Sequence, residues 1–253
     1  MTPATARPRR GPDIVLLHGW GLHGGVWDDI VPALSVRHRV HVVDLPGHGR
    51  ARDVPFENLD AATGRVAEAI PDGALLCGWS LGALVALALA AQFPARLSGL
   101  VLVSATPSFV RRPGWTQAMA PETLAQFARG LREDPEATIR AFLALNAMGS
   151  AGARSQVRAL AARLARGGVP SATTLEESLA TLRDADLRSA AARIAVPTLV
   201  LHGERDRLAP VAAGRWLADN IPDARWTGFH DAAHLPFMTH RDAFVAAIED
   251  FHG

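Results

Sequence analysis

The stretch Ala74-Leu-Leu-Cys-Gly-Trp-Ser-Leu-Gly-Ala-Leu-Val-Ala-Leu-Ala-Leu-Ala-Ala-Gln92 decides the fold. Leu75 to Cys77 are apolar enough for a buried parallel strand, and the alanine- and leucine-rich remainder predicts a helix. Between them, Gly78 and Gly82 lack the Cβ atoms that would clash where the strand meets the helix. This spacing predicts a strained strand-to-helix turn that presents Ser80 above the sheet as a nucleophile.

Further strand-like segments occur along the chain, and most are followed by a loop and a helix-compatible stretch. This alternation indicates a mostly parallel central sheet flanked by helices. Because ligands bind beyond the carboxyl ends of such strands, we expect the functional side chains to gather at one edge of the sheet. The predicted strands are Asp13 to Leu17, Val40 to Asp44, Leu75 to Gly78, Leu100 to Val103, Pro197 to His202 and Arg225 to Phe229.

The strand pattern disappears between Pro107 and Leu187. A structureless connection of roughly 80 residues is unusual within a compact domain, so we predict an inserted helical lid. The predicted division is a first core part at residues 1–109, a lid at 110–187 and a second core part at 188–253. The predicted lid helices are Pro121 to Leu131, Pro135 to Met148, Ala153 to Arg166 and Ala172 to Arg183.

Composition excludes several classes of function. The chain has 253 residues, 49% hydrophobic content and a net charge of +1, so nothing indicates a nucleic-acid or membrane partner. Every basic residue is arginine, which excludes a Schiff-base lysine and a P-loop. The single cysteine, Cys77, is expected in the core. Thr2 to Pro12 resembles no signal peptide, so we expect a cytoplasmic location. We also expect the protein to be a monomer.

A serine nucleophile needs a general base and a carboxylate that fixes the tautomer of that base. His234 follows the last predicted strand and is the candidate base. Asp206 lies in the loop after the preceding strand and is the candidate acid, with Glu204 and Asp231 as rivals. Asp206 is favoured because it lies farther into its loop and has more freedom to reach the histidine.

The oxyanion formed during acyl transfer needs two backbone N–H donors. The amide of Leu81, directly after the nucleophile, is one candidate, and Trp20, in the loop after the first strand, supplies the other. Core packing is the alternative for the side chains of Trp20 and Trp79, but beside the serine they would form an apolar floor, so both are predicted to bind substrate. His18 is expected to brace the Trp20 loop by bonding to backbone.

No cofactor is expected. The chain lacks the Cys/His spacing of a zinc site and a His-Glu-x-x-His motif. The glycines after the first strand read His-Gly-Trp-Gly, which differs from the dinucleotide-binding Gly-x-Gly-x-x-Gly pattern.

With these motifs assembled, the chain resembles the α/β-hydrolase superfamily and, within it, the pimeloyl-[acyl-carrier protein] methyl ester esterases of biotin synthesis. The resemblance implies the triad Ser80, Asp206 and His234 and a substrate-binding role for Phe142. It also implies that Arg154 and Arg158 receive the carrier protein. The stretches that carry it are Leu16 to Leu22, Val43 to Gly47, Gly78 to Gly82, Phe142 to Leu145 with Met148-Gly149, and Ala232 to Phe237.

The segment Ala137 to Pro170 contains five arginines and no acidic residue, which predicts a local positive patch. Arg154 and Arg158 are four residues apart and so share a helix face. Val157, Leu160 and Leu164 form an adjacent apolar face expected to turn toward the pocket. Two departures from the family stand out: Arg140 is offset by one residue, and the stretch before Ile14 is too short for a leading hairpin.

The resemblance implies hydrolysis of the carrier-bound methyl ester to methanol and a free carboxylate. Two alternatives stay open at this point. A general short-chain carboxylesterase, acting on small-molecule esters, would need only a roomier lid. A receptor would use the same residues only to bind a ligand, although backbone strain at a nucleophile has little purpose in a passive site.

Overall fold

In the computed structural model, which describes residues 11–252, the six strands form one sheet. All neighbouring strands are parallel, in the order β2-β1-β3-β4-β5-β6. The predicted parallel sheet is therefore confirmed, with each strand found within a few residues of its predicted position. The strands are β1 (Asp13–Leu17), β2 (Arg39–Val43), β3 (Ala74–Trp79), β4 (Leu97–Val103), β5 (Thr198–Gly203) and β6 (Ala224–Phe229).

Burial of the strands follows their place in the sheet. Every residue of β3 and β5 is buried, as is most of β1 and β4, because helices cover both faces there. The edge strands β2 and β6 are mostly half-buried. The central position of β3 places the strand-to-helix turn in the middle of the sheet edge.

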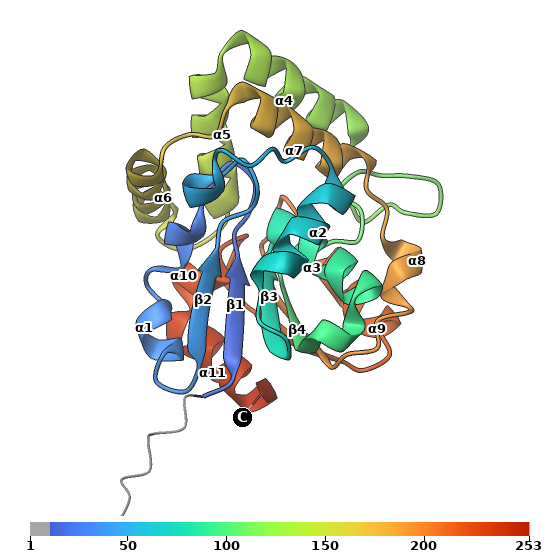
Figure 1. Cartoon of the computed structure of the whole chain (residues 1–253). Helices are drawn as coiled ribbons and strands as arrows, with labels where there is room; N and C mark the ends of the chain where they lie inside the picture. The colour runs from blue at the N-terminus through green and yellow to red at the C-terminus, as the bar shows by residue number, and fades with distance from the viewer. Residues whose placement is uncertain (1–10, 253) are drawn as a thin grey trace, which may run out of the picture.

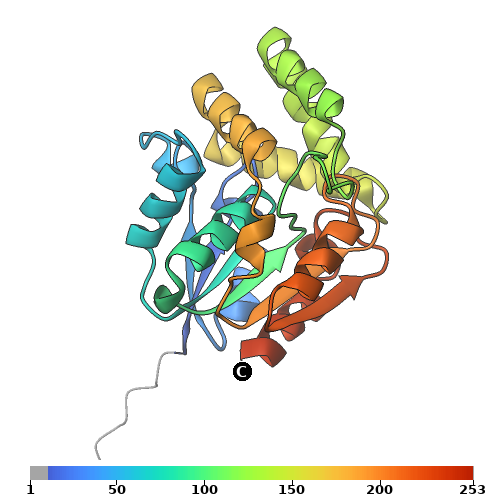
Figure 2. The same cartoon turned by 90° about the vertical axis from the view of Figure 1, so that its right-hand side faces the viewer.

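Helices pack against both faces of the sheet (Figures 1 and 2). The helices α2, α3, α8 and α9 cover one face, and α1 and α11 cover the other. Helix α3 is apolar all round and almost wholly buried, which suits its place against β3 and β4. The bounds are α1 (Val31–Leu34), α2 (Leu59–Ala69), α3 (Leu81–Gln92), α8 (Arg188–Ala191), α9 (Val211–Asn220), α10 (Pro236–Thr239) and α11 (Arg241–His252), with short 3-10 turns η1 (Gly24–Trp27), η2 (Gly49–Ala51) and η3 (Pro94–Arg96).

Four helices between β4 and β5 lie above the carboxyl ends of the strands (Figure 1). They are α4 (Pro121–Glu133), α5 (Pro135–Ala147), α6 (Ala153–Gly167) and α7 (Ala172–Asp184). Each agrees with its predicted range to within two residues, and we refer to the four together as the lid. The exact division of the chain at residues 109 and 187 stays a prediction.

The C-terminal end of α6 is fastened to the sheet domain. Arg163 is buried and forms an ion pair with Asp29, while its backbone carbonyl accepts a 2.8 Å hydrogen bond from Nε2 of His23. Arg52 donates to the carbonyl of Gly167 at 3.1 Å. The Gly167 carbonyl is at the end of the helix and has no intrahelical donor, so Arg52 satisfies it, and together these contacts anchor this part of the lid.

Among residues 11–252, no helix has the length and apolar character needed to cross a membrane. The predicted absence of a signal peptide concerns Thr2 to Pro12, which lies almost wholly outside the described residues.

Candidate active site

Ser80 occupies the turn between β3 and α3 with φ of 56° and ψ of −115°, a conformation that is strained for a residue with a side chain. The two flanking glycines make this turn possible. A Cβ atom on Gly78 would lie 2.3 Å from the carbonyl oxygen of Gly82, and one on Gly82 would lie 2.5 Å from the carbonyl oxygen of His18. The sequence therefore folds into the predicted turn because only glycine fits at both positions.

His234 and Asp206 meet beside this turn, on the loops that follow β6 and β5. Nδ1 of His234 lies 2.6 Å from Oδ2 of Asp206, and both side chains are buried. Within residues 11–252, Nε2 of His234 is buried and has no hydrogen-bond partner, so it is not hydrogen-bonded to the Ser80 hydroxyl. Such contacts often tighten only when substrate binds, so this nitrogen is free to accept a proton.

Asp206 is held as a carboxylate by its surroundings. Burial alone would raise its pKa, but the nearby charge of His234 and contacts with the imidazoles of His202 and His234 outweigh burial and hold the pKa well below its usual range. Its Oδ1 also accepts the N–H groups of Leu208 at 2.9 Å and Ala209 at 3.0 Å. The carboxylate is therefore fixed in orientation with Oδ2 facing His234.

The two rival acids pair elsewhere. Glu204 lies 3.0 Å from Nδ1 of His230, and Asp231 forms an ion pair with Arg205. The His230 side chain is largely exposed, and those of Glu204, Arg205 and Asp231 are partly exposed. Of the three candidate acids, the structure therefore brings only Asp206 to His234.

His18 bonds to backbone on both sides, as predicted. Its Nε2 accepts the N–H of Leu45 at 2.9 Å, so Nδ1 carries the proton and donates to the carbonyl of Gly19 at 2.8 Å. Burial, with the neighbouring His48, lowers the pKa of His18 to about 3, which keeps the ring neutral. This neutral ring fixes the loop that carries Trp20.

The two expected oxyanion donors lie at element boundaries close to Ser80. Leu81 is the first residue of α3, so its N–H has no acceptor within the helix. Trp20 follows β1, the strand that pairs with β3. Their role as donors stays a prediction.

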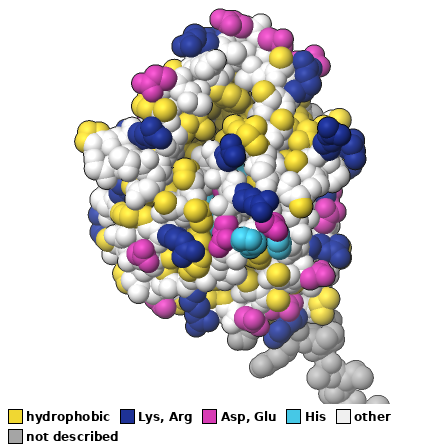
Figure 3. All heavy atoms as spheres, turned by 180° about the vertical axis from the view of Figure 1, so that it is seen from behind, with side chains coloured by type: hydrophobic (Ala, Val, Ile, Leu, Met, Phe, Trp, Pro, Cys, Tyr) yellow, Lys and Arg dark blue, Asp and Glu magenta, His cyan; other side chains and the backbone are white. Residues whose placement is uncertain are grey.

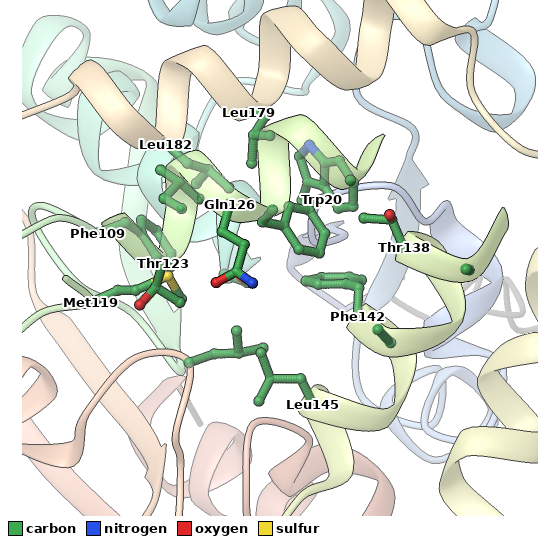
Figure 4. Close-up of a pocket in the computed structure, with 17 residues that line it drawn as sticks. Trp20, Phe109, Met119, Thr123, Gln126, Thr138, Phe142, Leu145, Leu179 and Leu182 are labelled. Atoms are coloured by element: carbon green, nitrogen blue, oxygen red, sulfur yellow. The ribbon is translucent and has the colours of Figure 1, made fainter. Parts of the chain in front are cut away.

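Ser80 is one of the residues that line a cavity of about 440 Å³. Figure 4 shows this cavity. Its walls are mostly apolar, and the lid supplies most of them. The indole ring of Trp20 lies edge-on to two phenylalanine rings, with its centroid 4.9 Å from that of Phe142 and 5.4 Å from that of Phe127. In Figure 4, Trp20 and Phe142 point into the cavity. The lining residues are Trp20, Ser80, Phe109, Met119, Thr123, Leu124, Gln126, Phe127, Gly130, Ala137, Thr138, Ala141, Phe142, Leu145, Leu179, Leu182 and Leu208.

Trp79 is placed differently from Trp20. It is fully buried and does not line the cavity; its indole N–H donates to the carbonyl of His234 at 2.8 Å, and its ring packs on Phe237. Of the two expectations for this residue, the structure therefore shows core packing beneath the histidine. Gln126, Phe127 and Leu145 also line the cavity but were not predicted, because the sequence of a lid helix does not show which of its sides meets the cavity.

A backbone hydrogen bond joins the lid to the histidine loop. The N–H of His234 donates to the carbonyl of Asn146 at 3.2 Å. This carbonyl belongs to the last turn of α5, where carbonyls have no intrahelical donor.

The positive patch is smaller than the sequence suggests. Arg154 and Arg158 are exposed and form no ion pair within residues 11–252. The other three arginines of the segment are each paired with an acid: Arg140 with Glu136, Arg163 with Asp29 and Arg166 with Asp28. Figure 3 shows hydrophobic side chains gathered on the upper part of one face, with basic and acidic groups scattered around them.

The expected orientation of α6 is wrong. Leu160 and Leu164 are buried and Val157 is half-buried against the hydrophobic core, and none of them lines the cavity. Helices α4, α5 and α7 form the cavity wall, because the contacts of α6 with η1 and α5 turn its apolar face elsewhere.

No group of three or more His, Cys, Asp or Glu side chains in the described part of the chain is placed to hold a metal ion.

The sequence is similar to those of known proteins. Residues 12–241 match the alpha/beta hydrolase fold family. The chain is 41% identical to the pimeloyl-[acyl-carrier protein] methyl ester esterase of Nitrosomonas europaea, covering 94% of this chain and 95% of the relative. It is also 41% identical to the enzyme of the same name from Aeromonas hydrophila, covering all of both chains.

Among solved structures, an esterase from Exiguobacterium antarcticum superposes with a TM-score of 0.87 at 23% identity, covering 96% of this chain and 92% of that one. At that identity the likeness concerns the fold alone. The family match and the two relatives extend over almost the whole chain. The chain therefore belongs to the alpha/beta hydrolase fold family and, within it, to the group of the pimeloyl-[acyl-carrier protein] methyl ester esterases.

Proposed function

We propose that the protein is a serine carboxylesterase that hydrolyses the methyl ester of pimeloyl-[acyl-carrier protein] methyl ester in biotin biosynthesis. The observation that carries this proposal is the buried Asp206–His234 pair beside a strained serine at the foot of an apolar cavity. Ester hydrolysis uses each of these features, whereas a passive receptor needs none of them.

The reaction proceeds in two acyl-transfer steps. The Ser80 hydroxyl attacks the ester carbonyl while Nε2 of His234 takes its proton, and the resulting oxyanion is bound by the N–H groups of Trp20 and Leu81. Collapse expels methanol, which receives the proton from His234. Water then attacks the acyl-enzyme with His234 again as base, which releases the free carboxylate and regenerates Ser80.

The apolar cavity suits the methylene chain of the substrate. Trp20, Phe142 and Leu145 offer hydrocarbon and aromatic surface, and burying methylenes there stabilises the complex by about 0.8 kcal/mol for each CH₂. The thioester, attached to the bulky carrier, stays outside the cavity and is spared.

Arg154 and Arg158 support docking of the carrier. Two exposed guanidinium groups on one helix face attract an acidic partner over long range and form charge-assisted hydrogen bonds on contact. The ion pair of Arg163 with Asp29 ties α6 to the sheet domain, which favours a fixed place for this docking surface relative to Ser80.

One comparison of rates tests the proposal. We expect kcat/KM for the carrier-bound pimeloyl methyl ester to exceed that for a free short-chain methyl ester, and Ser80→Ala to abolish both reactions. Equal values for the two substrates would favour a general short-chain carboxylesterase. Binding of esters without turnover would favour a receptor, and organophosphonate labelling of another serine in place of Ser80 would refute the site.

A further inference from the structure

A second histidine lies against Asp206. His202 is the next-to-last residue of β5 and is fully buried. Its Nε2 is 2.8 Å from the carbonyl oxygen of Ala209 and 3.4 Å from Oδ2 of Asp206. A carbonyl oxygen can only accept, so Nε2 carries the proton and donates it to Ala209, with Oδ2 of Asp206 in polar contact beside this N–H.

The imidazole of His202 is held on several sides. It stacks on Trp226 with ring centroids 6.0 Å apart and an interplanar angle of 21°, and Arg215 covers the Trp226 ring at 4.8 Å. A Cβ atom on Gly214 would lie 2.3 Å from Nδ1 of His202. The lack of a side chain at Gly214 therefore makes room for this ring in this orientation.

Packing alone does not account for a histidine at this position. Within the described part of the chain, Nδ1 of His202 is buried with no hydrogen-bond partner, which costs free energy of folding. A phenylalanine or methionine would fill the space without burying an unpaired polar atom. What histidine adds is the Nε2–H group, which donates to the carbonyl of Ala209 and lies 3.4 Å from Oδ2 of Asp206.

We propose that His202 is a positioning residue for ester hydrolysis, whose Nε2–H holds the Asp206 carboxylate and its loop in the orientation that faces His234. The inference rests on the proposed function, since it assigns His202 to the same reaction. Oδ1 of Asp206 is already fixed by the amides of Leu208 and Ala209, and the His202 N–H restrains the remaining end of the loop. The carboxylate thus stays aligned while His234 gains and loses its proton.

Two variants separate the N–H group from the bulk of the ring. We expect His202→Phe to lower kcat for a free methyl ester by about 10- to 100-fold, because it removes both the hydrogen bond to the loop and the polar contact with the carboxylate, with KM within about twofold. His202→Gln places an amide N–H near the position of Nε2 and should recover most of the lost kcat. If the phenylalanine variant does not fold, His202→Met takes its place.

A double-mutant cycle with Asp206→Asn separates positioning from general stability. If His202 acts through Asp206, adding His202→Phe to Asp206→Asn should lower kcat by less than about threefold. An equal loss in both backgrounds, an effect confined to KM, or a kcat for His202→Phe within twofold of the wild type would each overturn the inference. Activity that persists in Ser80→Ala would instead refute the proposed function, so the two failures are distinguishable.

Discussion

The two sides of the cavity are built differently. On the sheet side, Ser80, Asp206 and His234 stand on loops that follow strands, and hydrogen bonds fix both carboxylate oxygens of Asp206 and Nδ1 of His234. On the lid side, the α4–α5 hairpin presents Phe127, Phe142 and other apolar groups. Within residues 11–252, no ion pair joins this hairpin to the sheet domain.

This difference separates chemistry from selection. Proton transfer depends on geometry within a few tenths of an ångström, which directional hydrogen bonds can maintain. Apolar contacts are not directional, so the lid wall can adapt to an acyl chain without disturbing the reacting groups. Changes on the sheet side should therefore alter kcat, and changes on the lid side should alter KM or the choice of substrate.

The largest effect is expected for Asp206→Asn. The carboxamide no longer favours the required tautomer of His234, so kcat should fall by about 10⁴-fold while the fold remains intact. Steady-state kinetics with a 4-nitrophenyl ester and circular dichroism would measure both. Glu204→Gln is the matched control and should retain near-normal activity. If Glu204→Gln lost activity and Asp206→Asn retained it, Glu204 would be the acid instead.

The sheet side should also be sensitive to acid. Burial lowers the pKa of His18 to about 3 and of His48 to about 4, from the ordinary value of 6.5. Below about pH 6.5 the two histidines of the unfolded chain take up protons, whereas those of the folded chain stay neutral down to their lowered pKa values. The free energy of unfolding therefore falls as the pH falls. Urea denaturation should show a loss of about 3 to 5 kcal/mol between pH 7 and 4.5.

A variant at one of these histidines sharpens this test. His48→Leu should remove roughly half of the pH dependence, because only His18 would then resist protonation. Equal urea midpoints at both pH values in the wild type would contradict the buried, neutral state of the two rings.

On the lid side, reversing the charge of the docking arginines should affect only one substrate. Arg154→Glu with Arg158→Glu should lower kcat/KM for the carrier-bound ester by about tenfold or more at low salt, with less loss at high salt. Hydrolysis of a free ester should stay within about twofold. Arg193→Glu with Arg225→Glu, the same charge change away from the lid, is the control. Equal losses on both substrates would indicate a damaged lid.

The smallest effect is expected at the cavity wall. Phe142→Ala removes an aromatic contact with Trp20 and should raise KM for a seven-carbon acyl ester by about 3- to 10-fold, with kcat nearly unchanged. Phe251→Ala, outside the cavity, should leave both constants as they are. A large fall in kcat for Phe142→Ala would break the separation between the two sides.

The elements of the fold could be predicted because their signals are local. Buried strands such as Leu75 to Cys77 are short apolar runs bounded by glycine, and helices such as α5 begin at a proline. The triad of Ser80, Asp206 and His234 could also be predicted from the sequence. Each of these residues follows a strand, and parallel strands bring such positions together.

What could not be predicted depends on partners far apart in the sequence. No residue close to Arg163 in the sequence indicates that Asp29 pairs with it. The five arginines between Ala137 and Pro170 were therefore predicted to form one positive patch. Trp20 and Trp79 are both bulky aromatic residues next to glycine-containing loops, yet one lines the cavity and the other packs under His234. Position within the packed structure, which residue type does not specify, decides such cases.

The hydrogen bond from the His234 N–H to the Asn146 carbonyl has a consequence for how lid motion can be observed. A backbone amide exchanges its hydrogen for deuterium only when its hydrogen bond opens. The His234 amide is thus protected as long as the last turn of α5 stays seated on the loop. Its deuterium uptake would report lid opening from within the active site, and a bound acyl chain that holds α5 in place should slow that uptake.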